Sequence, residues 1–329
     1  MRTAELDYDL PPDLIAQAPA EPRDSARLMV YERSTGAIRH RVFADLLDEL
    51  RPDDLVVVND TRVLPARIRA HRSTGGAVEL LLLERRAGGD WQALARPARR
   101  LRAGETLDAA GVPITVVDVQ REGHVIVTLP DAVPDTVGEM PLPPYIHRPP
   151  DDPEDYQTVY ARDPRSAAAP TAGLHFTAEL WQELRRRFEV AEVTLAVGLD
   201  TFRPVTTDDL TEHPLHSEAY VVGDPAAAAI EAALRERRRI VAVGTTTTRV
   251  LETVWGTGAR LAGRTRLFIT PGHRFAATGA LVTNFHLPRS TLLAMVMAFA
   301  GVEEVRQLYR TAVAERYRFY SFGDAMLIH

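Results

Sequence analysis

Runs of aliphatic residues and helically spaced apolar residues divide the chain into predicted strands and helices. Residues 55–58 are four aliphatic residues in a row followed by Asn59 and Asp60, which predicts a buried strand that ends in a polar turn. Comparable runs predict strands at residues 190–197, 240–243 and 267–269. Helical spacing predicts helices at residues 178–188, 225–238, 291–299 and 303–317. Because strands and helices alternate from about residue 175 onward, we expect an α/β domain with a largely parallel sheet.

Residues 66–140 follow a different pattern. Turn-forming residues such as Gly75, Gly76 and Asp90 separate short strand-like runs at residues 78–83, 91–95, 114–119 and 125–129. Several short strands without a helix between them are typical of a small antiparallel β-barrel. We therefore predict a discontinuous α/β catalytic body, residues 1–65 and 150–329, that carries an inserted β-barrel domain, residues 66–149.

Two residue types are absent from the 329 residues, cysteine and lysine, so all 39 basic side chains are arginine. The absence of cysteine excludes disulfides, thiolate metal sites and cysteine nucleophiles. The absence of lysine excludes Schiff-base chemistry and the lysine of a Walker A loop. Nucleophilic or acid–base work must therefore fall to His, Asp, Glu, Ser, Thr, Tyr or Arg.

The formal net charge of −6 conceals an uneven distribution of charge. Residues 66–104 contain nine arginines and three acidic residues, a local charge of +6 that leaves −12 for the rest of the chain. A basic module on an acidic body can bind a polyanion such as RNA. The candidates for phosphate contact are Arg96, Arg99, Arg100 and Arg102.

Neither a secretory signal nor a membrane span is expected. The first ten residues carry acids and no apolar core, and the longest apolar stretch, residues 291–302, is shorter than the ~18 residues that a span requires. We therefore expect a cytoplasmic protein that has no membrane partner, with a monomer as the working expectation.

His213, His216 and Glu218 form the first candidate for a metal site. Two imidazoles and a carboxylate on one helical turn could face one ion. Pro214 lies between the histidines and argues against a regular helix, and no further ligand is evident. We therefore favour loop histidines with local hydrogen bonds and expect no metal.

Residues 244–249, Gly-Thr-Thr-Thr-Thr-Arg, follow the predicted strand at residues 240–243 and precede a helical stretch. Glycine and hydroxyl groups at such a turn expose backbone N–H groups, which commonly hold an anion or a ribose. The alternative is simple helix capping by one threonine. Four threonines beside Arg249 exceed what a cap requires, so ligand binding is favoured. The G-x-G-x-x-G fingerprint of a dinucleotide cofactor site is absent.

Three other segments place polar side chains at predicted turns. Residues 168–176 are mostly small, which allows close approach to a ligand, and they deliver His175 as a candidate base or donor, or as a packed core histidine. Residues 283–288, Thr-Asn-Phe-His-Leu-Pro, likewise place polar side chains and a histidine at the end of a predicted strand. Residues 317–326 either place Asp324 beside the same ligand site as His175 or form a final aromatic strand. Together these segments predict an α/β enzyme with a loop site rich in hydroxyl and amide groups.

At these residues the chain resembles the S-adenosylmethionine:tRNA ribosyltransferase-isomerases of queuosine biosynthesis, the QueA family. Ten matching segments in the same order span nearly the whole chain. They are Y-D-L-P (8–11), N-D-T-R-V-L-P-A-R (59–67), M-P-L-P-P-Y-I (140–146), Y-Q-T-V-Y (156–160), A-A-P-T-A-G-L-H-F (168–176), A-V-G-T-T (242–246), T-N-F-H-L-P (283–288), S-T-L (290–292), Y-R-F (317–319) and G-D-A-M (323–326).

The resemblance implies an α/β body with a mixed, largely parallel, flattened and barrel-like sheet, and an inserted β-barrel. It also implies transfer and isomerisation of the ribosyl part of S-adenosylmethionine (AdoMet) onto 7-aminomethyl-7-deazaguanine at the tRNA wobble position, giving epoxyqueuosine-tRNA, adenine and methionine. AdoMet is a substrate, and no cofactor is implied. On this resemblance we expect His175, in proton transfer, and Asp324 to be catalytic. The expected substrate-binding residues are Asn59, Thr61, Arg62, Gly244, Thr245, Thr246, Arg249, Asn284 and His286.

The chain departs from the family pattern at four positions. Arg165 and Asp200 stand in place of glycine, Ala196 in place of histidine, and Gly279 in place of aspartate. Either these positions are structural and the family activity is retained, or the chain is a diverged paralogue that uses AdoMet on another deazapurine or RNA acceptor. A third possibility is a non-catalytic tRNA-binding protein.

Overall fold

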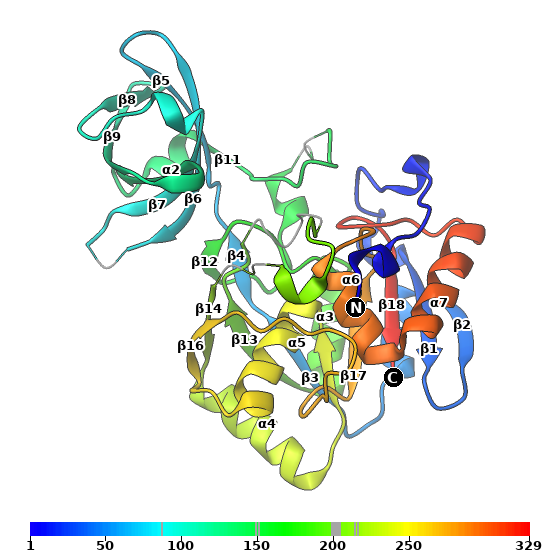
Figure 1. Ribbon diagram of the computed structural model, residues 1–329. Coiled ribbons are helices and arrows are strands. Elements are labelled where there is room, and N and C mark those ends of the chain that lie inside the picture. The colour runs from blue at the N-terminus through cyan, green and yellow to red at the C-terminus, as the bar shows by residue number, and fades with distance from the viewer. Residues whose placement is uncertain (87, 149, 151, 199–204, 214, 216) are drawn as a thin grey trace. The chain divides into compact units, whose positions relative to one another are not determined.

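A computed structural model describes residues 1–86, 88–148, 150, 152–198, 205–213, 215 and 217–329, which divide into two compact units (Figure 1). The first unit contains Met1–Thr61, Pro144–Asp163 and Ala169–His329, and the second contains Arg62–Pro143 and Pro164–Ala168. The sequence pattern placed the two boundaries a few residues later, at 65/66 and 149/150. It gave no sign that residues 164–168 belong with the second unit.

A nine-stranded mixed sheet forms the centre of the first unit. Strands β13, β3, β15 and β17 are adjacent and parallel, β1 and β18 form a second parallel pair, and the other neighbours are antiparallel. The predicted α/β fold with a mixed sheet that contains parallel strands is therefore confirmed. The strands lie in the order β16 (Ala262–Thr265), β14 (Glu218–Val222), β13 (Glu189–Leu195), β3 (Leu55–Asn59), β15 (Ile240–Val243), β17 (Ala280–Asn284), β18 (Ala325–Ile328), β1 (Arg27–Glu32) and β2 (Ala37–Val42).

Helices cover both faces of the sheet, which explains why the central strands are apolar at nearly every position. On one face, Val56 and Val58 of β3 share a buried cluster with Leu180 and Leu184 of α3 (Ala178–Arg187) and with residues of α1 (Leu46–Glu49). On the other face, α4 (Asp224–Glu236) and α5 (Thr245–Leu251) contact β13, β3 and β15. The remaining helices of this unit are α6 (Thr291–Ala300) and α7 (Val302–Ala314).

The helices lie within a few residues of the predicted ranges, and local signals set their starts. The hydroxyls of Thr177 and Ser290 cap α3 and α6 by accepting from backbone N–H groups of the first turn. Helix α5 continues into a π-helical turn, Glu252–Gly256. There the fully buried carboxylate of Glu252 accepts hydrogen bonds from the backbone of residues 276–278, which anchors the segment before β17.

The predicted strand at residues 267–269 is wrong, because the structure has no strand there and β16 ends at Thr265. The N–H of Leu267 donates to the hydroxyl of Thr265, and its carbonyl accepts from the guanidinium of Arg249. Ile269 is buried by side-chain packing. The apolar run therefore indicates burial here and not a strand. Side chains form hydrogen bonds with the N–H and carbonyl of Leu267, which are the groups that strand pairing would use.

The second unit contains a closed antiparallel β-barrel. Its strands pair in the order β5 (Arg67–Arg72), β6 (Ala77–Arg85), β7 (Trp91–Arg96), β10 (His124–Thr128), β9 (Val112–Val119) and β8 (Thr106–Ala109), and β8 pairs again with β5. Buried and exposed residues alternate along β5 and β9, as a small filled barrel requires. The predicted barrel is confirmed. The unit also contains the short β11 (Gly138–Glu139) and α2 (Val133–Val137). Strands β4 (Thr61–Val63) and β12 (Asp163–Ser166) pair with each other, and each continues into this unit from a first residue that belongs to the first unit. In the described part of the chain, every helix is too short or too polar to cross a membrane.

Candidate active site

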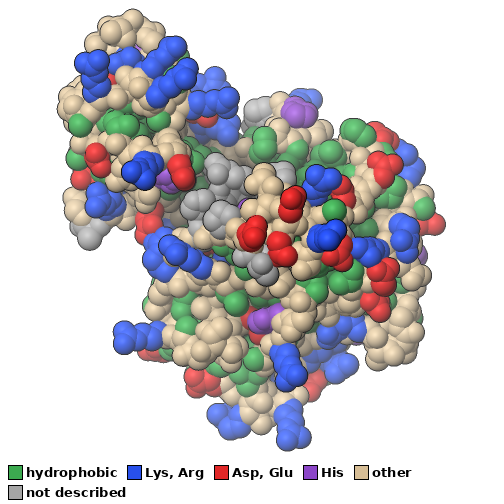
Figure 2. Space-filling model, viewed as in Figure 1, with side chains coloured by type: hydrophobic (Ala, Val, Ile, Leu, Met, Phe, Trp, Pro, Cys, Tyr) green, Lys and Arg blue, Asp and Glu red, His purple; other side chains and the backbone are tan. Residues whose placement is uncertain are grey.

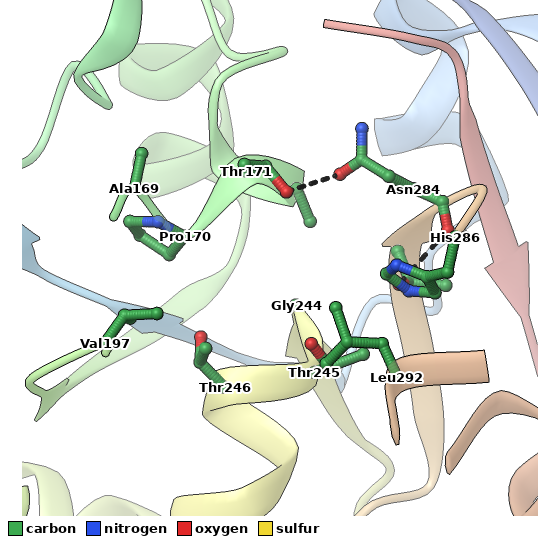
Figure 3. Close-up of a pocket in the computed structure, with 12 residues that line it drawn as sticks. Ala169, Pro170, Thr171, Val197, Gly244, Thr245, Thr246, Asn284, His286 and Leu292 are labelled. Atoms are coloured by element: carbon green, nitrogen blue, oxygen red, sulfur yellow. Dashed lines mark hydrogen bonds between the residues drawn. The ribbon is translucent and has the colours of Figure 1, made fainter. Parts of the chain in front are cut away.

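A pocket in the first unit lies at the carboxyl ends of the parallel strands (Figure 3). Gly244 follows β15, Asn284 ends β17, and Val197 lies two residues beyond β13. Ligands of open α/β sheets bind at this edge, where the loops after parallel strands meet. The lining residues are Ala169, Pro170, Thr171, Ala172, Val197, Gly244, Thr245, Thr246, Thr283, Asn284, His286 and Leu292.

The turn between β15 and α5 supplies three of the predicted substrate-binding residues. Gly244 has a φ of +93°, a backbone conformation that residues with a side chain rarely adopt. The hydroxyls of Thr247 and Thr248 donate back to the carbonyls of Val243 and Gly244. Thr245 and Thr246 line the pocket instead. Two of the four threonines therefore serve the helix, and two face the pocket.

Asn59 supports the pocket from beneath and does not line it. The side chain is fully buried, and its Nδ2 atom donates to the Leu195 carbonyl and to the Thr246 hydroxyl, each at 3.2 Å. Its Oδ1 atom accepts from the N–H groups of Leu195 and Thr61. Asn59 thus ties the ends of β3 and β13 to α5. Thr61 is buried behind it, and Arg62 belongs to the second unit.

Arg249 lies one turn further along α5 and outside the pocket lining. Its guanidinium forms an ion pair with Glu218, and the same carboxylate accepts from the Gly198 N–H at 2.9 Å. Burial lowers the pKa of Arg249 to about 10. The buried pair thus holds the chain just after Val197, and substrate binding by Arg249 stays a prediction.

His286 is the titratable side chain of the lining. Its N–H donates to the hydroxyl of Tyr309, its carbonyl accepts from the hydroxyl of Tyr8, and its Nε2 atom lies 2.7 Å from the Thr283 hydroxyl. Burial lowers the pKa of the imidazole to about 3, so the ring is neutral at pH 7. Hydrogen bonds thus hold both the backbone of His286 and one nitrogen of its ring.

The two residues expected to be catalytic lie outside the lining. His175 is 4% exposed, stacks on the ring of Phe43 and hydrogen-bonds with Asn284. Burial, with the charges of Arg318 and Arg23, lowers its pKa to about 3. The two carboxylate oxygens of Asp324 accept from the backbone N–H groups of Arg27 and Arg318. Asp324 therefore joins β1 to the segment before β18.

The two buried histidines predict a specific loss of stability in acid. Both stay neutral in the folded protein down to a pKa of about 3, whereas an unfolded histidine takes a proton near pH 6.5. Unfolding therefore takes up protons as the pH falls below about 6.5. We expect each histidine to lower the free energy of unfolding by about 1 kcal/mol between about pH 7.5 and about pH 5.5.

Urea unfolding at these two pH values measures the effect. His175→Gln and His286→Gln should each remove one histidine's share of the loss, whereas the exposed His147→Gln should leave the full loss in place. Equal losses in all four proteins would contradict the assignment of the two buried imidazoles as neutral.

The four arginines expected to bind RNA lie on the surface of the barrel unit, which carries several arginines on the face shown in Figure 2. Arg96 ends β7, Arg99 and Arg100 lie in the 3-10 turn Ala98–Arg100, and Arg102 follows. All four are exposed, whereas Arg72 of the same unit pairs with Glu105. The whole unit holds twelve arginines and ten acidic residues, so its net charge is only +2. The basic character is therefore local.

The candidate metal site is only partly described, because Pro214 and His216 lie outside the described residues. The Glu218 carboxylate is already engaged by Arg249 and Gly198. Within the described ranges, no cluster of three or more His, Asp or Glu side chains is arranged to hold a metal ion.

The departures from the family pattern lie outside the pocket lining where the structure describes them. Ala196 is half-buried and its N–H donates to the Ala219 carbonyl, Arg165 is exposed on β12, and Asp200 lies outside the described residues. A Cβ atom at Gly279 would approach the Cγ atom of Arg239 to 2.9 Å. Arg239 is held by two hydrogen bonds to the buried Asp54, so glycine at position 279 accommodates that ion pair.

Sequence reasoning did not single out several residues that build the pocket. Thr171, Thr283, Val197 and Leu292 line it, and Tyr8 anchors the backbone of His286. All except Val197 lie in segments that match the family pattern, so the resemblance could have pointed to them. Matching segments do not show which of their side chains face the pocket.

Comparisons with known proteins agree along the whole chain. The model of the family described as queuosine biosynthesis protein matches residues 3–328. Proteins named S-adenosylmethionine:tRNA ribosyltransferase-isomerase are 53% identical in Symbiobacterium thermophilum, with full coverage of both chains, and 53% identical in Rubrobacter xylanophilus, covering 100% of this chain and 98% of that one. A crystal structure of S-adenosylmethionine tRNA ribosyltransferase from Thermotoga maritima aligns with 99% of this chain and 100% of that chain at 39% identity and a TM-score of 0.59. The chain therefore belongs to the queuosine biosynthesis family, the S-adenosylmethionine:tRNA ribosyltransferase-isomerases.

Proposed function

We propose that this chain transfers and isomerises the ribosyl part of AdoMet onto 7-aminomethyl-7-deazaguanine at the tRNA wobble position, giving epoxyqueuosine-tRNA, adenine and methionine. The single observation that carries this function is the 53% identity over the full length to relatives named for it. The pocket supports it independently, because it lies where α/β enzymes bind their substrates.

The composition of the pocket suits a sulfonium substrate. Its lining consists of hydroxyl, amide, imidazole and apolar groups, and the one titratable group among them is neutral at pH 7. A cationic sulfonium therefore meets no positive side chain among the lining residues. The hydroxyls of Thr245 and Thr246 and the amide of Asn284 match the hydrogen-bonding groups of a ribosyl unit.

His286 is the group we assign to proton transfer. The positive sulfur acidifies the carbon next to it, so the reaction requires a base that takes a proton from that carbon. The Nε2 atom of His286 lies 2.7 Å from the Thr283 hydroxyl, which can accept a hydrogen bond from it. In the tautomer in which Nε2–H donates to Thr283, the lone pair on Nδ1 is left to accept the substrate proton.

The tRNA partner would be bound in part by the barrel unit. Arg96, Arg99, Arg100 and Arg102 offer four exposed guanidinium groups within seven consecutive residues, which suits the phosphates of a folded RNA. The acceptor base, 7-aminomethyl-7-deazaguanine, is part of this proposal. So are a monomeric enzyme and a cytoplasmic location, where tRNA is available.

Incubation with AdoMet and tRNA that carries 7-aminomethyl-7-deazaguanine tests the proposal. Release of adenine and methionine together with epoxyqueuosine in the digested tRNA is the expected result. Turnover of AdoMet only with a free deazapurine or another RNA would instead identify the chain as a diverged paralogue that acts on that acceptor. Binding of tRNA without any release of adenine would replace it with a non-catalytic role.

A further inference from the structure

The side-chain amide of Asn284 is held by three partners from two separate parts of the chain, Thr171 and His175 of one loop and Tyr320 near the C-terminal strand. Its Nδ2 atom lies 3.1 Å from the carbonyl oxygen of Tyr320 and 3.1 Å from Nε2 of His175. Its Oδ1 atom lies 3.2 Å from the hydroxyl of Thr171, a contact drawn in Figure 3. Asn284 lines the pocket and is 2% exposed, so these partners determine how it meets a ligand.

The Tyr320 carbonyl decides which way round the amide lies. A carbonyl oxygen only accepts, so the amide atom that faces it must be the NH₂ group. One N–H of that group goes to Tyr320, and the other goes to His175. Nε2 of His175 must therefore be the acceptor, and the neutral ring carries its proton on Nδ1.

The loop that carries His175 is packed so that this arrangement persists. The imidazole stacks on Phe43 with ring centroids 4.8 Å apart. A Cβ atom at Gly173 would lie 1.9 Å from the hydroxyl of Tyr160, so the loop presses directly against that side chain. The low pKa of His175, caused first by burial, agrees with a ring that stays neutral.

We propose that His175 is a positioning residue: its unprotonated Nε2 atom fixes the amide of Asn284, which then presents Oδ1 to the pocket as an acceptor for a hydroxyl of the ribosyl substrate. Only the identity of that substrate rests on the proposed function. With both N–H groups committed, Asn284 offers a ligand its carbonyl oxygen alone, which has one lone pair beyond the one that Thr171 uses. This role takes the place of the proton transfer that the sequence suggested for His175.

A double-mutant cycle separates positioning from direct catalysis. His175→Leu removes the acceptor and is expected to lower kcat/KM by about 10- to 100-fold, the cost of a misplaced contact. His175→Gln keeps an oxygen that can accept and is expected to stay within about threefold of the wild type. In an Asn284→Ala background, His175→Leu should add little, because its effect passes through Asn284. Losses that multiply, or an equal loss in His175→Gln and His175→Leu, would overturn the proposal.

A second readout needs no turnover. In the protein labelled with ¹⁵N-histidine, the resonance that disappears in His175→Gln should show a protonated Nδ1 and an unprotonated Nε2. It should keep that signature from about pH 8 to about pH 5, where an ordinary histidine titrates. A proton on Nε2, or titration within this range, would overturn the proposal. Because the signal is independent of substrate, a failure of the proposed function remains distinguishable.

Discussion

Replacing His286 by glutamine is expected to lower kcat by about 10²- to 10⁴-fold, the contribution of a positioned general base. Glutamine can keep the hydrogen bond to Thr283 but cannot accept the substrate proton. AdoMet affinity should change by less than about tenfold, since the other lining groups remain. The rate of adenine release at saturating AdoMet and tRNA, with AdoMet binding measured by calorimetry, gives the two quantities separately.

The matched control for this variant is His147→Gln, which changes an exposed histidine of the same unit. It should release adenine at the wild-type rate. If His286→Gln retained wild-type kcat, the base would have to be another group. If it lost AdoMet binding and turnover in parallel, His286 would be a binding residue.

Neutralising Arg96, Arg99, Arg100 and Arg102 together, each to glutamine, should weaken tRNA binding by about 10²- to 10³-fold at 0.1 M salt. Each phosphate contact contributes about 0.7–0.9 to the slope of log affinity against log salt, so four lost contacts should flatten that slope by about 3. Binding titrations with tRNA at several salt concentrations give both numbers. Turnover at saturating tRNA should persist, because the variant leaves the pocket intact.

A control with the same charge change uses Arg185, Arg186, Arg235 and Arg310, four exposed arginines on helices of the first unit. Its salt slope should stay close to that of the wild type. An unchanged slope in the barrel variant would identify its four arginines as solvated surface, and an equal change in both variants would indicate a general charge effect.

The architecture was largely predictable from sequence because its buried strands are apolar on both faces. Residues 55–58 and 240–243 gave β3 and β15, and the short runs of residues 78–129 gave barrel strands. The same rule failed at residues 267–269, where Arg249 and Thr265 take the backbone groups of an apolar segment. Apolar runs therefore indicate burial, whereas strand pairing also requires that the backbone N–H and carbonyl groups are not already hydrogen-bonded to side chains.

The site was predictable as a set of segments but not as a set of roles. Asn59 and Asn284 both end parallel strands, yet one supports the pocket from beneath and the other lines it. His175 and His286 both follow small or polar loop residues, yet only His286 lines the pocket. Helices and loops that are distant in sequence determine which side chain at a strand end faces a ligand. The segment that contains Tyr320 is an example, because its carbonyl orients Asn284.

The position of β18 has a consequence for how the chain becomes an enzyme during synthesis. Although it comes last in the sequence, β18 lies between β17 and β1, so it joins the start of the chain to the pocket-bearing strands. Until residues 325–328 have left the ribosome, the two parts of the sheet have no ladder between them, and each presents an unpaired edge. Between the synthesis of β17 and that of β18, a nascent chain of this protein thus carries two exposed sheet edges that can pair with neighbouring chains.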